Sequence, residues 1–230
     1  MSLLKNPGRL VGLLYVVISI PGFFALLYVP GKVFVRGDAT ATAHNILASE
    51  SLFRLGITTD LISQALFILV ALALYDLLKD VNRWLARLML ILILIPVAIV
   101  FMAEANALLA IRLVRGANYL SLFDEPQRNA LAMLFLNLRG FGFDVAQIFW
   151  AVWLLPLGML VYRSGFVPRI LGILVIVACC AYMANSFTTL VAPEYERLVG
   201  RWASPVKLLE LTFPLWLLIA GATPKPSPSS

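Results

Sequence analysis

Seven polar side chains lie within long apolar stretches of the sequence, and their types are well suited to chemistry: Asp60, Gln64, Glu104, Arg139, Asp144, Gln147 and Asn185. Burial of such groups in apolar surroundings is costly unless each finds a partner. Carboxylates and amides beside an arginine could hold a small polar ligand, a lipid headgroup or an ion, or could relay protons. They could also neutralise one another and only fix how the chain packs. The elements that carry them decide between these roles.

The composition indicates that those elements are membrane-spanning helices. Of the 230 residues, 61% are hydrophobic and 13% are charged, and the mean hydropathy is +0.92. A soluble domain is about 45–50% apolar and about 25% charged. Because a helix needs about 20 apolar residues to cross a membrane, six spans use roughly 120 residues. No room remains for a soluble catalytic domain beside them.

Six apolar runs predict an all-α integral membrane bundle of six transmembrane helices in a single domain, residues 1–222. Pro21 followed by Gly22 predicts a kink in the first helix. The proline- and serine-rich tail, residues 223–230, is expected to be disordered. The predicted spans are residues 10–29, 55–75, 84–111, 130–162, 170–190 and 206–220.

Polar residues and prolines mark the starts of the later helices. A capping side chain followed by proline in the first turn is typical of a helix N-terminus. Polar segments 38–50 and 193–200 are expected to form short interfacial helices on the outer side. The start signals are Asp124 to Pro126, Pro168, and Ser204 with Pro205.

The basic residues predict that both termini lie on the cytoplasmic side. With that orientation the inner segments carry eight basic and two acidic residues, whereas the outer set carries ten of each. Positive charge in short connecting segments favours the cytoplasmic side of a membrane. The sequence therefore predicts an N-in, C-in protein of the cell (inner) membrane.

The polar residues reach similar heights on these helices. With a rise of 1.5 Å per residue, Asp60, Glu104, Asp144 and Asn185 lie roughly 24–28 Å above the inner ends of their spans, and Glu210 lies somewhat deeper. The sequence thus predicts a layer of four carboxylates in the outer part of the membrane. Four basic residues lie at or above that layer: Arg54, Arg112, Arg139 and Lys207.

Helical spacing places several of these side chains on common faces. Residues three or four apart share one face of a helix. Gln64 shares a face with Asp60, and Gln147 shares a polar stripe along one helix face with Asp144. Asn185 follows Tyr182 in the same way on its own span. Lipid would penalise such stripes, so they are expected to face one another.

Three interpretations of the layer stay open: a ligand-binding cavity, a structural network, and a relay of protons or ions. It could be a polar cavity, opening outward, around Asp60, Glu104, Arg139 and Asp144, that binds a small polar or lipid-derived ligand or carries it across. It could instead be a structural network, because four acids and four bases balance. Two other functions remain: an accessory subunit of a larger membrane complex, and a membrane enzyme that acts on lipids.

The remaining composition argues against several other classes. The single histidine, His44, and the adjacent Cys179 and Cys180 cannot build a typical zinc, haem or copper site, so no metal or cofactor is expected. No nucleophile motif is present, and no catalytic residue is predicted. Basic residues flank apolar runs, which favours lipid headgroups over nucleic acid as partners. The expected partners are membrane lipids, a small ligand and other membrane subunits.

One stretch resembles a known family. Residues 153–158 read WLLPLG, residues 161–166 read VYRSGF and residues 168–172 read PRILG. These runs, with ESLFRLGI at residues 50–57, are similar to a bacterial multi-pass membrane family catalogued as domain-of-unknown-function family 4386. The resemblance covers nearly the whole chain. It implies a six-helix protein of the bacterial inner membrane, and it implies no activity.

Overall fold

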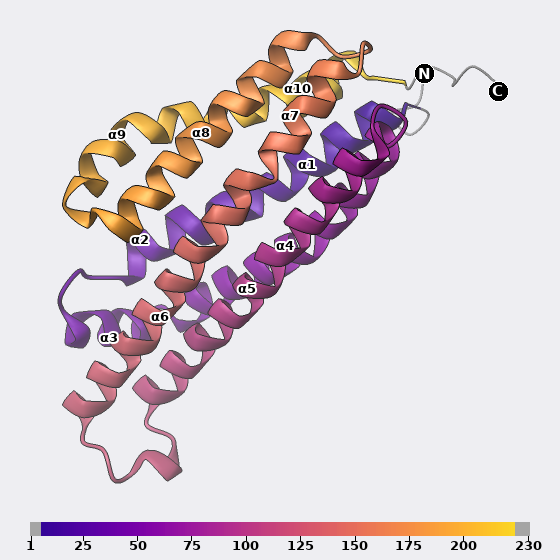
Figure 1. Ribbon diagram of the computed structural model, residues 1–230. Helices are drawn as coiled ribbons and strands as arrows, with labels where there is room; N and C mark the ends of the chain where they lie inside the picture. Colours follow the sequence, from indigo (N-terminus) through magenta and orange to yellow (C-terminus); the bar gives the residue numbers. More distant parts are fainter. Residues whose placement is uncertain (1–5, 224–230) are drawn as a thin grey trace. The chain divides into compact units, whose positions relative to one another are not determined.

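A computed structural model describes residues 6–223, and within this range the chain forms helices and no strand (Figure 1). The predicted all-α fold with six spans is confirmed, and each of the six membrane-spanning stretches is longer than predicted. The predicted orientation stays a prediction, and the tail after Thr223 lies outside the described residues. The stretches long and apolar enough to cross a membrane are Pro7–Val33, Glu50–Leu78, Arg83–Arg115, Glu125–Arg163, Arg169–Val191 and Pro193–Ala220.

The chain packs as two compact units. The first unit comprises Met1–Val17, Leu66–Val97 and Asp144–Ser230, and the second comprises Ile18–Ala65 and Ala98–Phe143. The single domain predicted for residues 1–222 stays a prediction. Four helices contribute one part to each unit: α1 (Pro7–Phe23), α4 (Glu50–Leu78), α5 (Arg83–Arg115) and α6 (Glu125–Val152).

In the second unit, the first span contains a change of helix type. Helix α1 continues through Pro21, and a π-helical turn, Phe24–Tyr28, joins it to α2 (Val29–Val33). The amide of Val29 donates to the carbonyl of Phe24, five residues back. Proline lacks an N–H and disturbs the ordinary ladder of a helix, and π-turns are one of the ways a helix accommodates such a disturbance. The kink expected at Pro21 and Gly22 stays a prediction, and the change of helix type begins at Phe24.

Helix α3 (Ala39–Ala48) fills most of the polar segment predicted to be helical. Its N-cap, Asp38, accepts a hydrogen bond from the amide of Ala41 at 2.8 Å. The Thr42 hydroxyl donates to the carbonyl of Val35 at 3.2 Å, and the amide of Val35 donates back to it at 3.0 Å. These bonds hold the preceding loop on α3. The interfacial position expected for this helix stays a prediction.

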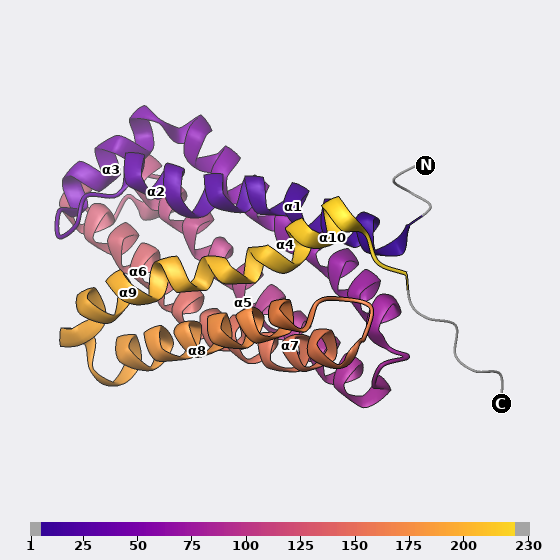
Figure 2. The same cartoon turned by 90° about the horizontal axis from the view of Figure 1, so that it is seen from above.

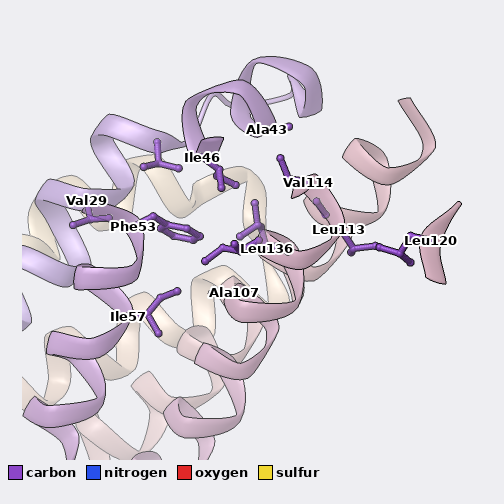
Figure 3. Close-up of a cluster of buried hydrophobic side chains, with 14 residues drawn as sticks. Val29, Ala43, Ile46, Phe53, Ile57, Ala107, Leu113, Val114, Leu120 and Leu136 are labelled. Carbon is purple, nitrogen blue, oxygen red and sulfur yellow. The ribbon is translucent and has the colours of Figure 1, made fainter. Parts of the chain in front are cut away.

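An apolar core holds the second unit together. Figure 3 shows Phe53 and Ile57 of α4 gathered with Ile46 of α3 and Leu136 of α6. Val29 of α2 belongs to the same cluster, and all five side chains are buried. Between helices surrounded by lipid, such close packing supplies much of the attraction.

Helix α6 begins at the predicted start signal, Asp124 to Pro126, and the structure adds a reciprocal cap there. The Asp124 carboxylate accepts from the amide of Gln127 at 2.8 Å, and the Gln127 side chain accepts from the amide of Asp124 at 3.0 Å. This exchange satisfies two backbone donors at the helix start. A turn at Trp153 separates α6 from α7 (Leu154–Arg163).

In the first unit, α7 and α8 (Arg169–Val191) form a tight hairpin and lie side by side (Figures 1 and 2). Two glycines let their backbones touch: a Cβ on Gly172 would lie 2.6 Å from the amide nitrogen of Tyr162 and 2.7 Å from the carbonyl oxygen of Gly158. In the turn, Gly165 has a φ of +69°, a conformation that favours glycine. All three glycines fall within the residues that carry the family resemblance.

The last span starts earlier than predicted. Helix α9 (Glu196–Lys207) contains Pro205, so the prediction that Ser204 and Pro205 begin the span is wrong. A 3-10 turn, Leu208–Leu211, joins α9 to α10 (Thr212–Ala220). Pro205 therefore lies near the end of α9, three residues before the 3-10 turn begins at Leu208. Segment 193–200, predicted as a separate interfacial helix, is part of this stretch.

Helices α1 and α10 are tied together in the first unit. The amide of Gly8 donates to the carbonyl of Ala222 at 3.0 Å, and the amide of Ala222 donates to Oδ1 of Asn6 at 3.0 Å. Large apolar side chains such as Ile219, 76% exposed, cover the outer faces of the helices. Exposed apolar surface of this kind suits contact with lipid.

We expect the α7–α8 contact to tolerate no side chain at Gly172. Gly172→Ala places a Cβ against backbone atoms and should lower the free energy of unfolding by about 1–3 kcal/mol. Gly22→Ala is the matched control, because a Cβ on Gly22 meets nothing within 4 Å. It should leave stability unchanged or raise it by up to about 1 kcal/mol. Detergent-induced unfolding, followed by tryptophan fluorescence, measures both, and equal effects would contradict the close contact.

Candidate functional site

A buried ion pair joins α5 and α6 in the second unit. Nε of Arg139 donates to both carboxylate oxygens of Glu104 at 3.1 Å, and Nη2 donates to Oε1 at 2.5 Å. Glu104 is fully buried and Arg139 is 7% exposed. The guanidinium also lies 4.7 Å from the centre of the Phe143 ring. Because both of its oxygens accept from Arg139, Glu104 is well neutralised.

Small residues bring the two helices close at this pair. A Cβ on Gly142 would lie 2.8 Å from Cβ of Ala103. Ala103 is next to Glu104 in the chain, and Gly142 comes one turn after Arg139. Small residues at such positions allow helix backbones to approach within a membrane. The packing thus places Glu104 and Arg139 within reach of each other.

Asp60 of α4 lies beside this pair without a hydrogen bond. Its side chain is 1% exposed, and neither Oδ1 nor Oδ2 has a partner among the described residues. The side chains of Glu104 and Gln64 both lie within interaction range of its carboxylate. Oε1 of Gln64, one turn along α4, is likewise buried and unpartnered. Unpaired acceptors of this kind are unusual and costly.

Neighbouring hydroxyls do not supply the missing donors. The Thr59 hydroxyl donates to the carbonyl of Leu55 at 2.8 Å. The Ser63 hydroxyl donates to the carbonyl of Thr59 at 2.7 Å. Both side chains therefore bond back to their own helix, a common habit of serine and threonine in apolar surroundings. The carboxylate of Asp60 keeps its full capacity to accept.

Only one of the four basic residues predicted around the layer pairs with an acid of the layer through a described salt bridge. Arg54 and Arg115 both bind Glu50, at 2.6 and 2.9 Å. That cluster is partly exposed at the start of α4, and it includes neither Asp60 nor Glu104. The layer as a whole has equal numbers of acids and bases, but the immediate surroundings of Asp60 do not. Around Asp60, two carboxylates meet one guanidinium, Arg139.

A second polar cluster lies in the first unit and is bonded throughout. Nε2 of Gln147 donates to the Ser186 hydroxyl at 3.1 Å, and Nζ of Lys207 donates to Oε1 of Gln147 at 3.0 Å. The Tyr182 hydroxyl donates to Oε1 of Glu210 at 3.1 Å. Lys207 also lies 4.9 Å from the centre of the Tyr182 ring. This cluster joins α6, α8, the end of α9 and the 3-10 turn that follows α9.

The seven predicted site residues thus belong to two units. Asp60, Gln64, Glu104 and Arg139 lie in the second unit, and Asp144, Gln147 and Asn185 lie in the first. Asp144 is half-buried, with the carboxylate of Glu196 within electrostatic range. Asn185 faces α9, where a Cβ on Gly200 would lie 3.5 Å from its Oδ1.

The sequence prediction missed Ser186 as a partner in the first unit. It preferred Asn185, three residues after Tyr182, although Ser186 stands four residues after it. Both spacings put a side chain on the same face as Tyr182. Gln147 of α6 lies next to Ser186 and binds it. This contact between helices cannot be predicted from the residues of α8 alone.

A cavity in the second unit lies at the end of α5. It has a volume of about 490 Å³ and is lined by Arg112, Arg115, Ala117 and Tyr119. None of these was a predicted site residue. The outward-opening cavity predicted around the polar layer stays a prediction.

The site in the second unit is suited to binding a hydrogen-bond donor. Its free groups are the acceptors of Asp60 and Gln64, next to a carboxylate that is already satisfied. Within residues 6–223, no group of three or more histidine, cysteine or acidic side chains is placed to hold a metal ion. The arrangement offers hydrogen-bond acceptors and negative charge, and no nucleophile activated by a base.

We expect the two members of the ion pair to respond unequally to loss of charge. Arg139→Gln leaves Asp60 and Glu104 together without a cation and should lower the free energy of unfolding by about 3–5 kcal/mol. Glu104→Gln should cost less, because Asp60 remains within range to neutralise Arg139. Detergent-induced unfolding measures the difference.

The control for this comparison is the exposed pair of Asp76 and Lys79. Asp76 is 68% exposed, so Asp76→Asn should leave stability nearly unchanged. Equal losses in Arg139→Gln and Glu104→Gln would show that Asp60 does not interact with the pair.

Comparison with known proteins places the chain in a family. A family model described as a domain of unknown function (DUF4386) matches residues 10–221. Over 78 residues the chain is 32% identical to an uncharacterized protein of Archaeoglobus fulgidus, a match that covers 34% of this chain and 45% of the archaeal one. The chain thus spans less than half the length of that relative. No solved structure matches. With six apolar helices and a match over almost its whole length, the chain belongs to the DUF4386 family of multi-pass membrane proteins.

Proposed function

We propose that the protein binds a small polar ligand at Asp60, beside the ion pair of Glu104 and Arg139, and holds it in the membrane or moves it across. The observation that supports this is the pair of unpartnered oxygens on a carboxylate that is 1% exposed. A buried acceptor without a donor costs free energy. A ligand that supplies donors would recover that free energy as affinity.

The composition of the site favours binding over a purely structural role. A structural network gains most when every member is satisfied, and a partly satisfied one is worse than an apolar core. Gln147 and its partners in the first unit are bonded in that way. Asp60 and Gln64 are not, and removal of either would relieve an unsatisfied group. Functional sites are where such local cost is usually retained.

The ligand can be sought directly in protein taken from its own membrane. The full chain is purified in mild detergent and denatured, and the released polar small molecules are quantified per chain by mass spectrometry. The wild type should release one compound in near-stoichiometric amount. Asp60→Asn should release at least about tenfold less, because it removes the charge of the main acceptor.

Asp76→Asn provides the matched control on the same helix, since Asp76 is exposed and paired with Lys79 at 2.6 Å. It should retain the wild-type amount. No released compound from the wild type, or equal amounts from wild type and Asp60→Asn, would overturn the proposal.

A further inference from the structure

From the same site we infer the chemical class of the ligand: a small organic monocation with N–H donors, of which a primary ammonium group is the simplest example. This inference rests on the proposed function and makes it more specific. The observations behind it are the kinds of atoms left free, their number, the local charge and the degree of burial.

The free buried atoms around Asp60 are all acceptors. They are Oδ1 and Oδ2 of Asp60 and Oε1 of Gln64. Nε and Nη2 of Arg139 donate to Glu104, and the Ser63 hydroxyl donates to its own helix, so none of these donors binds Asp60. A ligand that brings acceptors, such as a phosphate or a carboxylate, would meet repulsion from the carboxylates of Asp60 and Glu104.

The number of acceptors matches a primary ammonium. Asp60 and Gln64 are four residues apart on α4 and so lie on one face of the helix. An –NH3+ group has three donors, and three acceptor atoms are free. A quaternary ammonium has the same charge but no N–H, so it would leave all three acceptors unsatisfied.

The local charge calls for a monocation. The charged groups that act on Asp60 are Glu104 and Arg139. Two carboxylates and one guanidinium leave one negative charge in excess. Within a membrane an uncompensated charge is costly, which favours one compensating positive charge. A divalent ion would overcompensate and would lie near the arginine.

Burial sets the size of the binding group. Asp60, Gln64 and Glu104 are 1%, 7% and 0% exposed. The part of the ligand that reaches Asp60 must therefore be compact, as a methylammonium group is. The remainder of a larger amine would have to extend away from these three side chains.

Methylammonium and tetramethylammonium together test this inference. Thermal unfolding of the full chain, in lipid nanodiscs at constant ionic strength, is followed by tryptophan fluorescence while each chloride salt is titrated. Methylammonium should raise the Tm of the wild type in a saturable way, and tetramethylammonium should not. Asp60→Asn should weaken the apparent affinity for methylammonium by roughly tenfold or more, and Asp76→Asn should leave it unchanged.

A second variant separates charge from hydrogen bonding. Gln64→Leu removes one acceptor and keeps the negative charge, so it should weaken methylammonium binding less than Asp60→Asn does. It should also reduce the discrimination against tetramethylammonium. An equal response of the wild type to both salts, or an equal methylammonium response in wild type and Asp60→Asn, would overturn the inference.

A proton on Asp60 is the competing occupant. Infrared difference spectra between wild type and Asp60→Asn would then show the carbonyl band of a protonated acid, with no effect of methylammonium, and the inference would be wrong. If a compound is still released from the wild type and lost in Asp60→Asn while methylammonium has no effect, the inference fails and the proposed function stands. If neither result is obtained, both fail.

Discussion

The buried ion pair of Glu104 and Arg139 is the interaction on which the second unit depends. Charges within a membrane must be compensated, and here the guanidinium compensates a fully buried carboxylate. The pair forms because Ala103 and Gly142 let α5 and α6 approach. Once Arg139 is committed to Glu104, nothing among the described residues donates to Asp60. The free carboxylate of the site is thus a direct consequence of how its neighbour is satisfied.

The two polar clusters solve the same physical problem in different ways. In the first unit, amide, hydroxyl and ammonium groups alternate as donors and acceptors, so Gln147 bonds both Ser186 and Lys207. The 3-10 turn after Lys207 helps, because side chains three residues apart are eclipsed there and both Lys207 and Glu210 reach Tyr182. In the second unit the described hydrogen bonds of Arg139 all go to Glu104, and Asp60 receives none. The first arrangement suits a fixed packing contact, and the second leaves a group available to a ligand.

The sequence predicted the helices well because the hydropathy of a stretch depends only on the residues within it. Local pattern also identified Asp124 as a helix start, although not its exchange of hydrogen bonds with Gln127. The same kind of pattern misplaced the start of the last span at Pro205, which lies inside α9. The site was harder to predict. Asp60, Glu104 and Arg139 could be named from their apolar surroundings, but which acid Arg139 chooses depends on contacts between helices. Because such contacts cannot be read from the sequence, an equal count of acids and bases in the layer did not reveal the excess of negative charge around Asp60.

The π-turn at Phe24–Tyr28 has a consequence for alignment within the family. A π-turn holds one residue more than an α-turn, so the helix after it is rotated relative to an uninterrupted α-helix. Val29 is the first residue after the π-turn, and it packs against Gly56: a Cβ on Gly56 would lie 3.0 Å from the methyl groups of Val29. A relative whose first span is α-helical throughout would need one residue fewer here to present the same valine. A one-residue gap at this point would then mark a change of helix type and not a lost residue of the core.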